Sequence, residues 1–323
     1  MSPNVERVQL VAPGSLGTCW YGKYHYLEPW VGCEHNCPYC YARSRMAVRN
    51  SLAELGTNFA NPQPLLPRQE LLEAIERQAN SGQVSIFKLS RYTDIFSPRF
   101  VADGLSYEIL EILAKSRVSR VIITTKGAPD RQLLELLARY PQKFSYNAAC
   151  RPSSLLDPDP LPSFEKNLLP LRQRLEAAAQ AQEAGLLTTI HCDPFVAQID
   201  DQPQALQPFL DLLESYKLKR VMWSYLLLSP TLLESMPPLV DPKLWSELLE
   251  RYDLHSERQV LPGQEDTISF AQKNDVALES VDKVAKALMA RNFQFVLCSL
   301  KSIRGLNLRE YPRQMLCNGT FYA

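Results

Sequence analysis

The segment from residue 28 to residue 43 reads Glu28-Pro-Trp-Val-Gly-Cys33-Glu-His-Asn-Cys37-Pro-Tyr-Cys40-Tyr-Ala-Arg43. Its three cysteines follow a C-x3-C-x2-C spacing, so one short loop carries three thiols to one place. This spacing indicates a metal centre of one of two kinds. Three Cys and His35 could bind zinc, or three thiolates could hold a [4Fe–4S] cluster that keeps one iron open.

The position of this loop in the chain favours the cluster. A short apolar run at residues 24–27 reads as a strand, and a helical pattern follows the loop. The loop therefore stands at the carboxyl end of a strand–helix unit, where α/β proteins carry their active sites. A structural zinc site more often occupies a small hairpin of its own.

The rest of the chain alternates strands with helices. Predicted strands are Tyr24–Leu27, Val84–Leu89, Arg120–Thr125, Phe144–Ala149, Leu187–Cys192, Val221–Leu227 and Phe293–Leu300. Apolar residues recur with helical spacing near residues 71–75, 105–113 and 133–137, and again over 163–185 and 277–292. In the fourth of these, we expect Pro170 to start or kink the main helix and Gly185 to end it. This alternation predicts parallel βα units in a doubly wound sheet or in a full or partial barrel.

Residues 228–276 interrupt the alternation with five prolines. We interpret this stretch as an insertion or lid that contains one helix near Lys243–Tyr252. The expected organisation is a core with its N-terminal segment over 1–227, the insertion over 228–276, and a last βα unit with a C-terminal tail over 277–323.

The cysteine motif resembles that of the radical S-adenosylmethionine (SAM) enzymes, and further segments resemble their spore photoproduct lyase-like branch. The matching segments are Gly32-Cys33-x-His35-x-Cys37-x-Tyr39-Cys40-Tyr41-Ala42-Arg43, Thr93-Asp94-Ile-Phe-Ser-Pro98, Ile123-Thr-Thr-Lys126 with Arg131, Arg174-Leu175 and Ala184-Gly185. The resemblance runs from about residue 27 to residue 194. It implies an α/β fold, a partial (βα)6 TIM-type barrel with a C-terminal extension.

The resemblance also implies a chemistry and a set of residues. Cys33, Cys37 and Cys40 would ligate three irons, and SAM would chelate the fourth. Reductive cleavage of SAM would then give a 5′-deoxyadenosyl radical that abstracts hydrogen from an unactivated carbon. The residues expected at SAM are Tyr39 and Tyr41 near the adenine, Ser90 and Asp94 near the amino group, Lys126 near the carboxylate, and Arg174.

Further cysteines end predicted strands and are candidate hydrogen donors to a substrate radical. Cys150 and Cys192 are the expected catalytic pair, and Cys298 is a third possibility. Each could equally be a small buried hydrophobe. Cys19, Cys298 and Cys317 lack the tight spacing of an auxiliary cluster. His191 could contact substrate or be a core histidine.

The expected substrate is a peptide. DNA photoproduct lyases of this branch carry a hydrogen-donating Cys after the second strand, whereas Ser90 and Arg91 stand in that region here. The same branch resembles the spliceases, which excise a tyramine unit from precursor peptides and leave an α-keto-β-amino acid. We therefore expect a precursor peptide, a small leader-binding partner protein and an external electron donor. The alternatives are a nucleic-acid lesion lyase or base-modifying enzyme, and a zinc scaffold without enzymatic activity.

Charge and composition agree with this expectation. The chain of 323 residues carries 35 Lys+Arg and 35 Asp+Glu, so its formal net charge is zero. A balanced charge gives no general attraction to nucleic acid or to an anionic membrane. The first residues, MSPNVERVQL, lack the apolar core of a secretory signal, so we expect a cytoplasmic protein whose eight cysteines serve as ligands, redox groups or core residues.

Overall fold

The computed structural model describes residues 5–14, 24–259, 265–298, 315–317 and 321. Cys19, the end of the last predicted strand and most of the C-terminal tail lie outside these residues.

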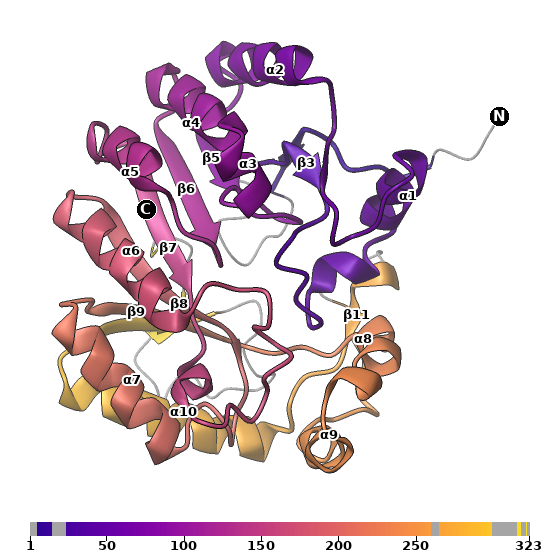
Figure 1. The fold of residues 1–323 in the computed structure, drawn as a ribbon. Coiled ribbons are helices and arrows are strands. Elements are labelled where there is room, and N and C mark those ends of the chain that lie inside the picture. Colours follow the sequence, from indigo (N-terminus) through magenta and orange to yellow (C-terminus); the bar gives the residue numbers. More distant parts are fainter. Residues whose placement is uncertain (1–4, 15–23, 260–264, 299–314, 318–320, 322–323) are drawn as a thin grey trace.

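The centre of the fold is an eight-stranded sheet in the order β1-β2-β5-β6-β7-β8-β9-β12 (Figure 1). The first strand pairs antiparallel to β2, and every other neighbouring pair is parallel. The strands of this sheet are β1 (Val11–Pro13), β2 (His25–Leu27), β5 (Ile86–Leu89), β6 (Arg120–Thr125), β7 (Phe144–Ala149), β8 (Leu187–Phe195), β9 (Arg220–Tyr225) and β12 (Gln294–Leu297). The seven predicted strands correspond to β2, β5, β6, β7, β8, β9 and β12, and β1 is an addition.

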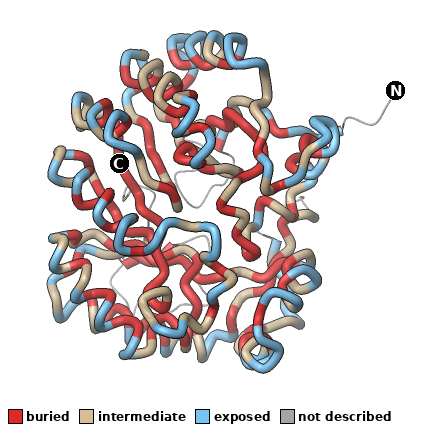
Figure 2. Tube along the Cα trace, in the orientation of Figure 1, coloured by how far each residue is buried: buried red, intermediate tan, exposed pale blue. Residues whose placement is uncertain are grey.

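Helices connect the parallel strands and cover the outside of the sheet (Figure 1). They are α1 (Met46–Glu54), α2 (Arg68–Asn80), α3 (Pro98–Ala102), α4 (Leu105–Lys115), α5 (Arg131–Ala138), α6 (Leu171–Glu183), α7 (Pro203–Ser215), α8 (Pro230–Ser235), α9 (Pro242–Leu249) and α10 (Asn274–Ala290). Their outward faces are exposed and the strands beneath are buried (Figure 2). The mostly parallel sheet with helices outside confirms the predicted α/β partial barrel.

The helix predicted over residues 163–185 is shorter than its pattern. Residues 163–169 form turns, and α6 begins directly after Pro170. The proline ring fixes φ and removes a backbone donor, which suits a helix start but not its interior. Gly185 follows the helix with φ +88°, a left-handed conformation that glycine adopts at low cost.

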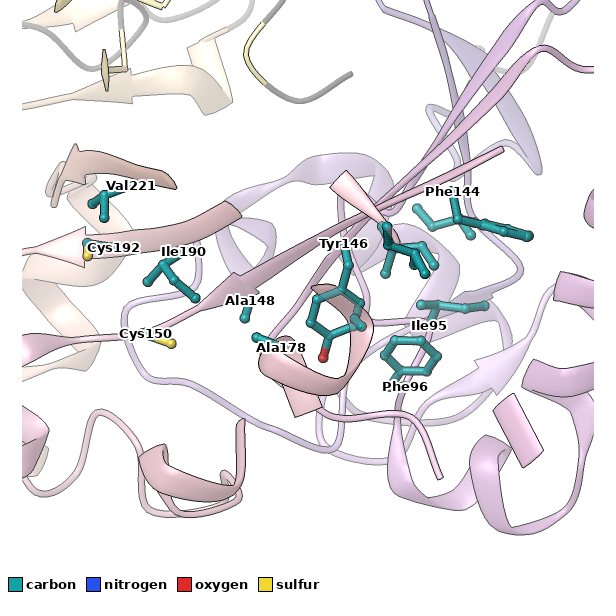
Figure 3. Packing of buried hydrophobic residues seen from close by; sticks show 14 of the residues in the cluster. Ile95, Phe96, Phe144, Tyr146, Ala148, Cys150, Ala178, Ile190, Cys192 and Val221 are labelled. Carbon is teal, nitrogen blue, oxygen red and sulfur yellow. The ribbon is translucent and has the colours of Figure 1, made fainter. Parts of the chain in front are cut away.

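Strand residues alternate between two environments. On β7, Phe144, Tyr146 and Ala148 pack into the main core between sheet and helices, beside Ala178 of α6 (Figure 3). Because side chains alternate along a strand, the residues between them point to the inside of the barrel. Ile122, Met222, Val296, Cys298 and Cys317 form a separate apolar cluster there.

The insertion, residues 228–276, contains two α-helices where the sequence predicted one. α8 starts at Pro230 behind Ser229, whose hydroxyl accepts a hydrogen bond from the Leu232 amide at 3.2 Å. α9 starts at Pro242 behind Asp241, which caps it in the same way. Proline is favoured at the first helical position, so residues that we interpreted as interruptions start helices here.

Two pairs of short strands complete the fold. β3 (Trp30–Val31) pairs with β4 (Gln63–Pro64), and β10 (Arg258–Gln259) pairs with β11 (Ile268–Ser269), both antiparallel. The first pair supports the start of the cysteine loop. No helix within the described ranges has the length and apolar character needed to cross a membrane.

Candidate active site

A cavity of about 300 Å³ opens at the carboxyl ends of the parallel strands. Its wall combines the cysteine loop (residues 32–43), the ends of β5, β6, β8 and β9, and part of the insertion. All three predicted cluster ligands line it, as do Tyr39, Tyr41, Ser90, Asp94 and Lys126. The fold thus brings nearly all the predicted site residues to one cavity.

Backbone geometry and one arginine shape the cysteine loop. Gly32 has φ +90°, and a Cβ there would lie 2.9 Å from the Phe59 carbonyl oxygen, so only glycine fits. The Cys33 amide donates to that same oxygen at 2.7 Å. Arg43 donates from Nε to the Cys37 carbonyl at 3.0 Å, and its guanidinium lies over the Phe59 ring. These contacts fix the loop without using its thiols.

The three thiols share a buried environment that disfavours their ionised form. Burial raises the pKa of Cys33, and Asp94 and the two other cysteines raise it further. Burial likewise raises the pKa of Cys40, and that of Cys37 to about 11, in spite of the nearby Lys126. Thiolates in such a place require a strong cationic partner, because a coordinated metal deprotonates its thiol ligands. The loop therefore suits metal coordination better than free-thiol chemistry.

His35 joins the cysteine loop to the strands. Its Nε2 lies 3.1 Å from Asp94 Oδ2. Asp94 also accepts hydrogen bonds from the Thr125 hydroxyl at 2.7 Å, the Lys126 amide at 2.7 Å and the Phe96 amide at 2.9 Å. Burial alone would raise the pKa of Asp94, but the His35 ring and these hydrogen bonds outweigh it and lower the pKa to about 2. Asp94 is thus a carboxylate whose oxygens are already occupied by the protein.

The zinc alternative fits this geometry poorly. The Nδ1 atom of His35 has no hydrogen-bond partner, and a histidine held by a carboxylate in this way is common at zinc sites. However, no three His, Cys, Asp or Glu side chains among the described residues converge closely enough for one metal ion. In a cluster each thiolate binds a different iron, so its ligands need not meet at one point.

Ser90, Thr93 and Lys126 stand around the loop at the ends of β5 and β6. The Ser90 hydroxyl donates to the Leu27 carbonyl at 2.9 Å, and the Thr93 hydroxyl to the Gly32 carbonyl at 2.5 Å. Lys126 donates from Nζ to the Asp193 carbonyl at 2.9 Å and lies 5.7 Å from the centre of the Tyr39 ring. A cation and hydroxyl oxygens therefore border the thiols on the strand side.

Glu28 is a functional candidate that the sequence reasoning missed. It is fully buried, and its two oxygens accept hydrogen bonds from the Arg91 and Tyr92 amides at 2.6 and 3.1 Å. Burial raises the pKa of Glu28 to about 7, although Arg91 opposes this shift. Glu28 directly follows the first predicted strand. A carboxylate at the end of a strand was the signal in the sequence that could have identified it.

The raised pKa of Glu28 predicts a pH dependence of stability. The folded protein holds this proton between about pH 4.5 and pH 7, where the unfolded chain releases it, so the free energy of unfolding falls as pH rises through this window. Glu28→Gln should remove that slope. Relative to the wild type, the variant should gain about 3 kcal/mol between pH 4 and pH 8. Urea unfolding across this range measures the gain, and parallel pH profiles for the two proteins would contradict the assignment.

Three predicted site residues lie away from the cavity. Arg174 lies on the buried face of α6. Its guanidinium pairs with Glu165 at 2.5 Å and donates to the Ala149 carbonyl at 2.6 Å. Cys150 and Cys192 fall on the helix-facing side of their strands, in the main core (Figure 3). None of the three lines the cavity. The positions of these three residues in the structure therefore give no support to their predicted roles at SAM or at the substrate.

Strand residues whose side chains point to the inside of the barrel do line the cavity. They include His191 and Asp193 on β8 and Ser224 on β9, with Cys298 after β12. His191 Nε2 lies 3.8 Å from an Asp193 carboxylate oxygen. The sequence is compatible with His191 as a core residue or as a substrate contact. Its place on the cavity wall favours contact with the substrate.

The insertion forms part of the cavity wall and is hydrogen-bonded to the residues that follow the cysteine loop. Arg45 donates to the Asp266 carbonyl at 3.0 Å, and the Met46 amide donates to the Asp266 carboxylate at 2.9 Å. Ser44 and Ser229 share a hydrogen bond of 2.9 Å. The insertion thus contributes part of the cavity wall.

No protein-family model and no curated protein matches this sequence. Solved structures do match the fold. Spore photoproduct lyase complexed with dinucleoside spore photoproduct aligns with a TM-score of 0.62 and 14% identity, over 90% of this chain and 80% of that one. A double mutant of the same lyase, with bound AdoMet and dinucleoside spore photoproduct, gives a TM-score of 0.59 and 13% identity over 92% and 80%.

A third match is more distant. Streptococcus suis SuiB bound to precursor peptide SuiA gives a TM-score of 0.50 and 13% identity, over 84% of this chain and 48% of that one. At these identities the likeness is one of fold.

Proposed function

We propose that this chain is a radical SAM enzyme that modifies a peptide. The observation that carries the proposal is the placement of three thiols from one loop on the wall of a cavity at the carboxyl ends of parallel strands. The origin of all three thiols in one loop suits ligation of a [4Fe–4S] cluster by Cys33, Cys37 and Cys40. The similar fold of a lyase with bound AdoMet supports SAM as the second cofactor.

Different cavity residues would bind different parts of SAM. When bound, the cluster would supply an electron for SAM cleavage, and the protein would orient the reactants and exclude water. Lys126 would pair with the methionyl carboxylate, and Tyr39 and Tyr41 would border the adenine. The Ser90 hydroxyl already donates its proton, so its oxygen can accept from the methionyl ammonium. Asp94 holds His35 and acts as a positioning residue.

Lys126→Gln should weaken SAM binding without loss of iron. A hydrogen bond to a charged group contributes about 1.5–3 kcal/mol, so the Kd should rise about 10- to 150-fold. Equilibrium binding of SAM to the reconstituted protein measures this change. Lys143→Gln is the matched control, because Lys143 also donates to a backbone carbonyl but precedes the amino end of β7. Equal SAM affinity in both variants would place the carboxylate elsewhere.

A peptide fits the apolar side of the cavity. Leu226, Leu232 and Ile268 line it from the insertion side, and SuiB, which shares the fold, is bound to a precursor peptide in its structure. The finer proposal is excision of tyramine from a Tyr-Gly step, which leaves an α-keto-β-amino acid. A small leader-binding protein and an external electron donor would act with the enzyme.

Lesion repair is the second candidate, because the lyase matches have higher TM-scores and cover more of their own chain than SuiB does. One experiment separates the two functions. Reduced enzyme and SAM are incubated with a Tyr-Gly precursor peptide or with a dinucleotide photoproduct. A SAM-dependent loss of a tyramine-sized mass, or another change in the peptide, supports the proposal. Reversal of the photoproduct with unchanged peptide overturns it.

A further inference from the structure

The Arg91 guanidinium is held at the cavity wall between aromatic rings. Its central carbon lies 4.2 Å from the centre of the Tyr92 ring and 5.0 Å from that of Tyr26. The Tyr41 hydroxyl donates to the Arg91 carbonyl, which fixes the backbone. All four residues line the cavity. Rings that contact the face of a guanidinium leave its N–H edge available for a ligand.

The charge of the Glu28 carboxyl group acts on the Arg91 guanidinium, but the two side chains form no direct ion pair. Arg91 Nε is buried and has no hydrogen-bond partner, and no carboxylate there forms an ion pair with the guanidinium. The nearest acid, Glu28, uses both oxygens on backbone amides. Of the acids that line the cavity, Asp94 is bound by His35, Asp266 is bound by Arg45, and Asp193 lies 3.8 Å from His191. A buried donor without an acceptor is costly, so a ligand that supplies one should bind there.

The surroundings select the class of ligand. The Arg45 charge is balanced by Asp266, and the Glu28 oxygens occupy the backbone amides beside Arg91, so the guanidinium is the planar donor group at this part of the wall. A planar fork of N–H groups matches a carboxylate in a bidentate way. Across the cavity, Leu226 and Leu232 offer an apolar surface.

We propose that Arg91 binds a carboxylate of the substrate and selects an acidic residue beside the side chain that is modified. This inference rests on the proposed function for its peptide context. The Tyr26 and Tyr92 rings hold the guanidinium in place, so the anchor is formed before the substrate arrives.

The test uses reconstituted protein saturated with SAM. Two probe pairs are titrated: 3-phenylpropionate against 3-phenylpropionamide, and two Tyr-Gly peptides that differ only by Glu or Gln beside the Tyr. Wild type should bind each acid at least tenfold more tightly than its amide. Arg91→Gln should abolish this difference, and Arg91→Lys should keep part of it. Arg172→Gln, an exposed arginine on α6, should behave as the wild type.

The outcomes separate this inference from the proposed function. Acid selectivity that depends on Arg91, together with peptides that are never modified, would uphold the anchor and overturn the peptide reaction. Modified peptides without acid selectivity would overturn the anchor alone. A loss of SAM affinity in Arg91→Gln would assign the guanidinium to SAM and would also overturn the anchor.

Discussion

Simultaneous replacement of Cys33, Cys37 and Cys40 by Ala should abolish iron and sulfide binding and reduce SAM cleavage to background. Three thiolates hold the cluster in the proposed site, and no other described cysteine lines the cavity except Cys298. The fold should persist, because the loop is fixed by backbone contacts and by Arg43 rather than by its thiols. Iron content, sulfide content and 5′-deoxyadenosine release after anaerobic reconstitution measure the effect.

Cys192→Ala is the matched control for this experiment. Cys192 is buried, as Cys33 and Cys37 are, but it lies in the helix-facing core. Its removal should cost about 1 kcal/mol of stability and leave iron and SAM cleavage intact. A full cluster in the triple variant would contradict the proposed ligation, and zinc in place of iron in the wild type would favour the zinc scaffold.

Asp94→Ala should destabilise the protein by about 3–5 kcal/mol, because it leaves buried polar partners without an acceptor. These partners are the His35 ring, the Thr125 hydroxyl and the Lys126 and Phe96 amides. The cysteine loop would lose its contact with β6, so the yield of iron after reconstitution should fall as well. Urea unfolding and iron analysis measure the two effects.

Asp193→Asn provides the comparison. Asp193 lines the same cavity, but its side chain is 27% exposed. Its substitution should change stability by less than about 1 kcal/mol. If Asp94→Ala kept full stability and iron and lost only SAM affinity, Asp94 would be a SAM ligand after all, as the sequence resemblance implied.

The sequence was sufficient to predict the positions of most strands along the chain and their parallel pairing, whereas the partial barrel was implied only by the family resemblance. Runs such as Arg120–Thr125 and Phe144–Ala149 have the bounds of β6 and β7, because short apolar runs with helical segments between them permit few other folds. The edge strand β1 was missed. It has three residues, one of them a proline, and pairs on one side only.

The cavity was predictable only in part. Cys150 directly follows β7, and Cys192 lies inside β8, which continues to Phe195. Strand alternation directs both side chains to the helices, and a shift of one residue decides that direction. The occupied oxygens of Asp94 depend on His35, 59 positions earlier in the chain. Such hydrogen-bond partners are determined by tertiary structure. The sequence therefore identified Asp94 as a site residue but did not indicate that it binds His35.

The contacts between the insertion and the cysteine loop make two distant segments thermodynamically dependent on each other. Asp266 and Ser229 hold residues 44–46, which directly follow the loop of the proposed cluster ligands. Linkage is reciprocal, so a cofactor that orders the loop tightens the insertion, and a ligand that orders the insertion raises affinity for the cofactor. Binding of a cofactor at the loop and binding of a ligand at the insertion should therefore favour each other.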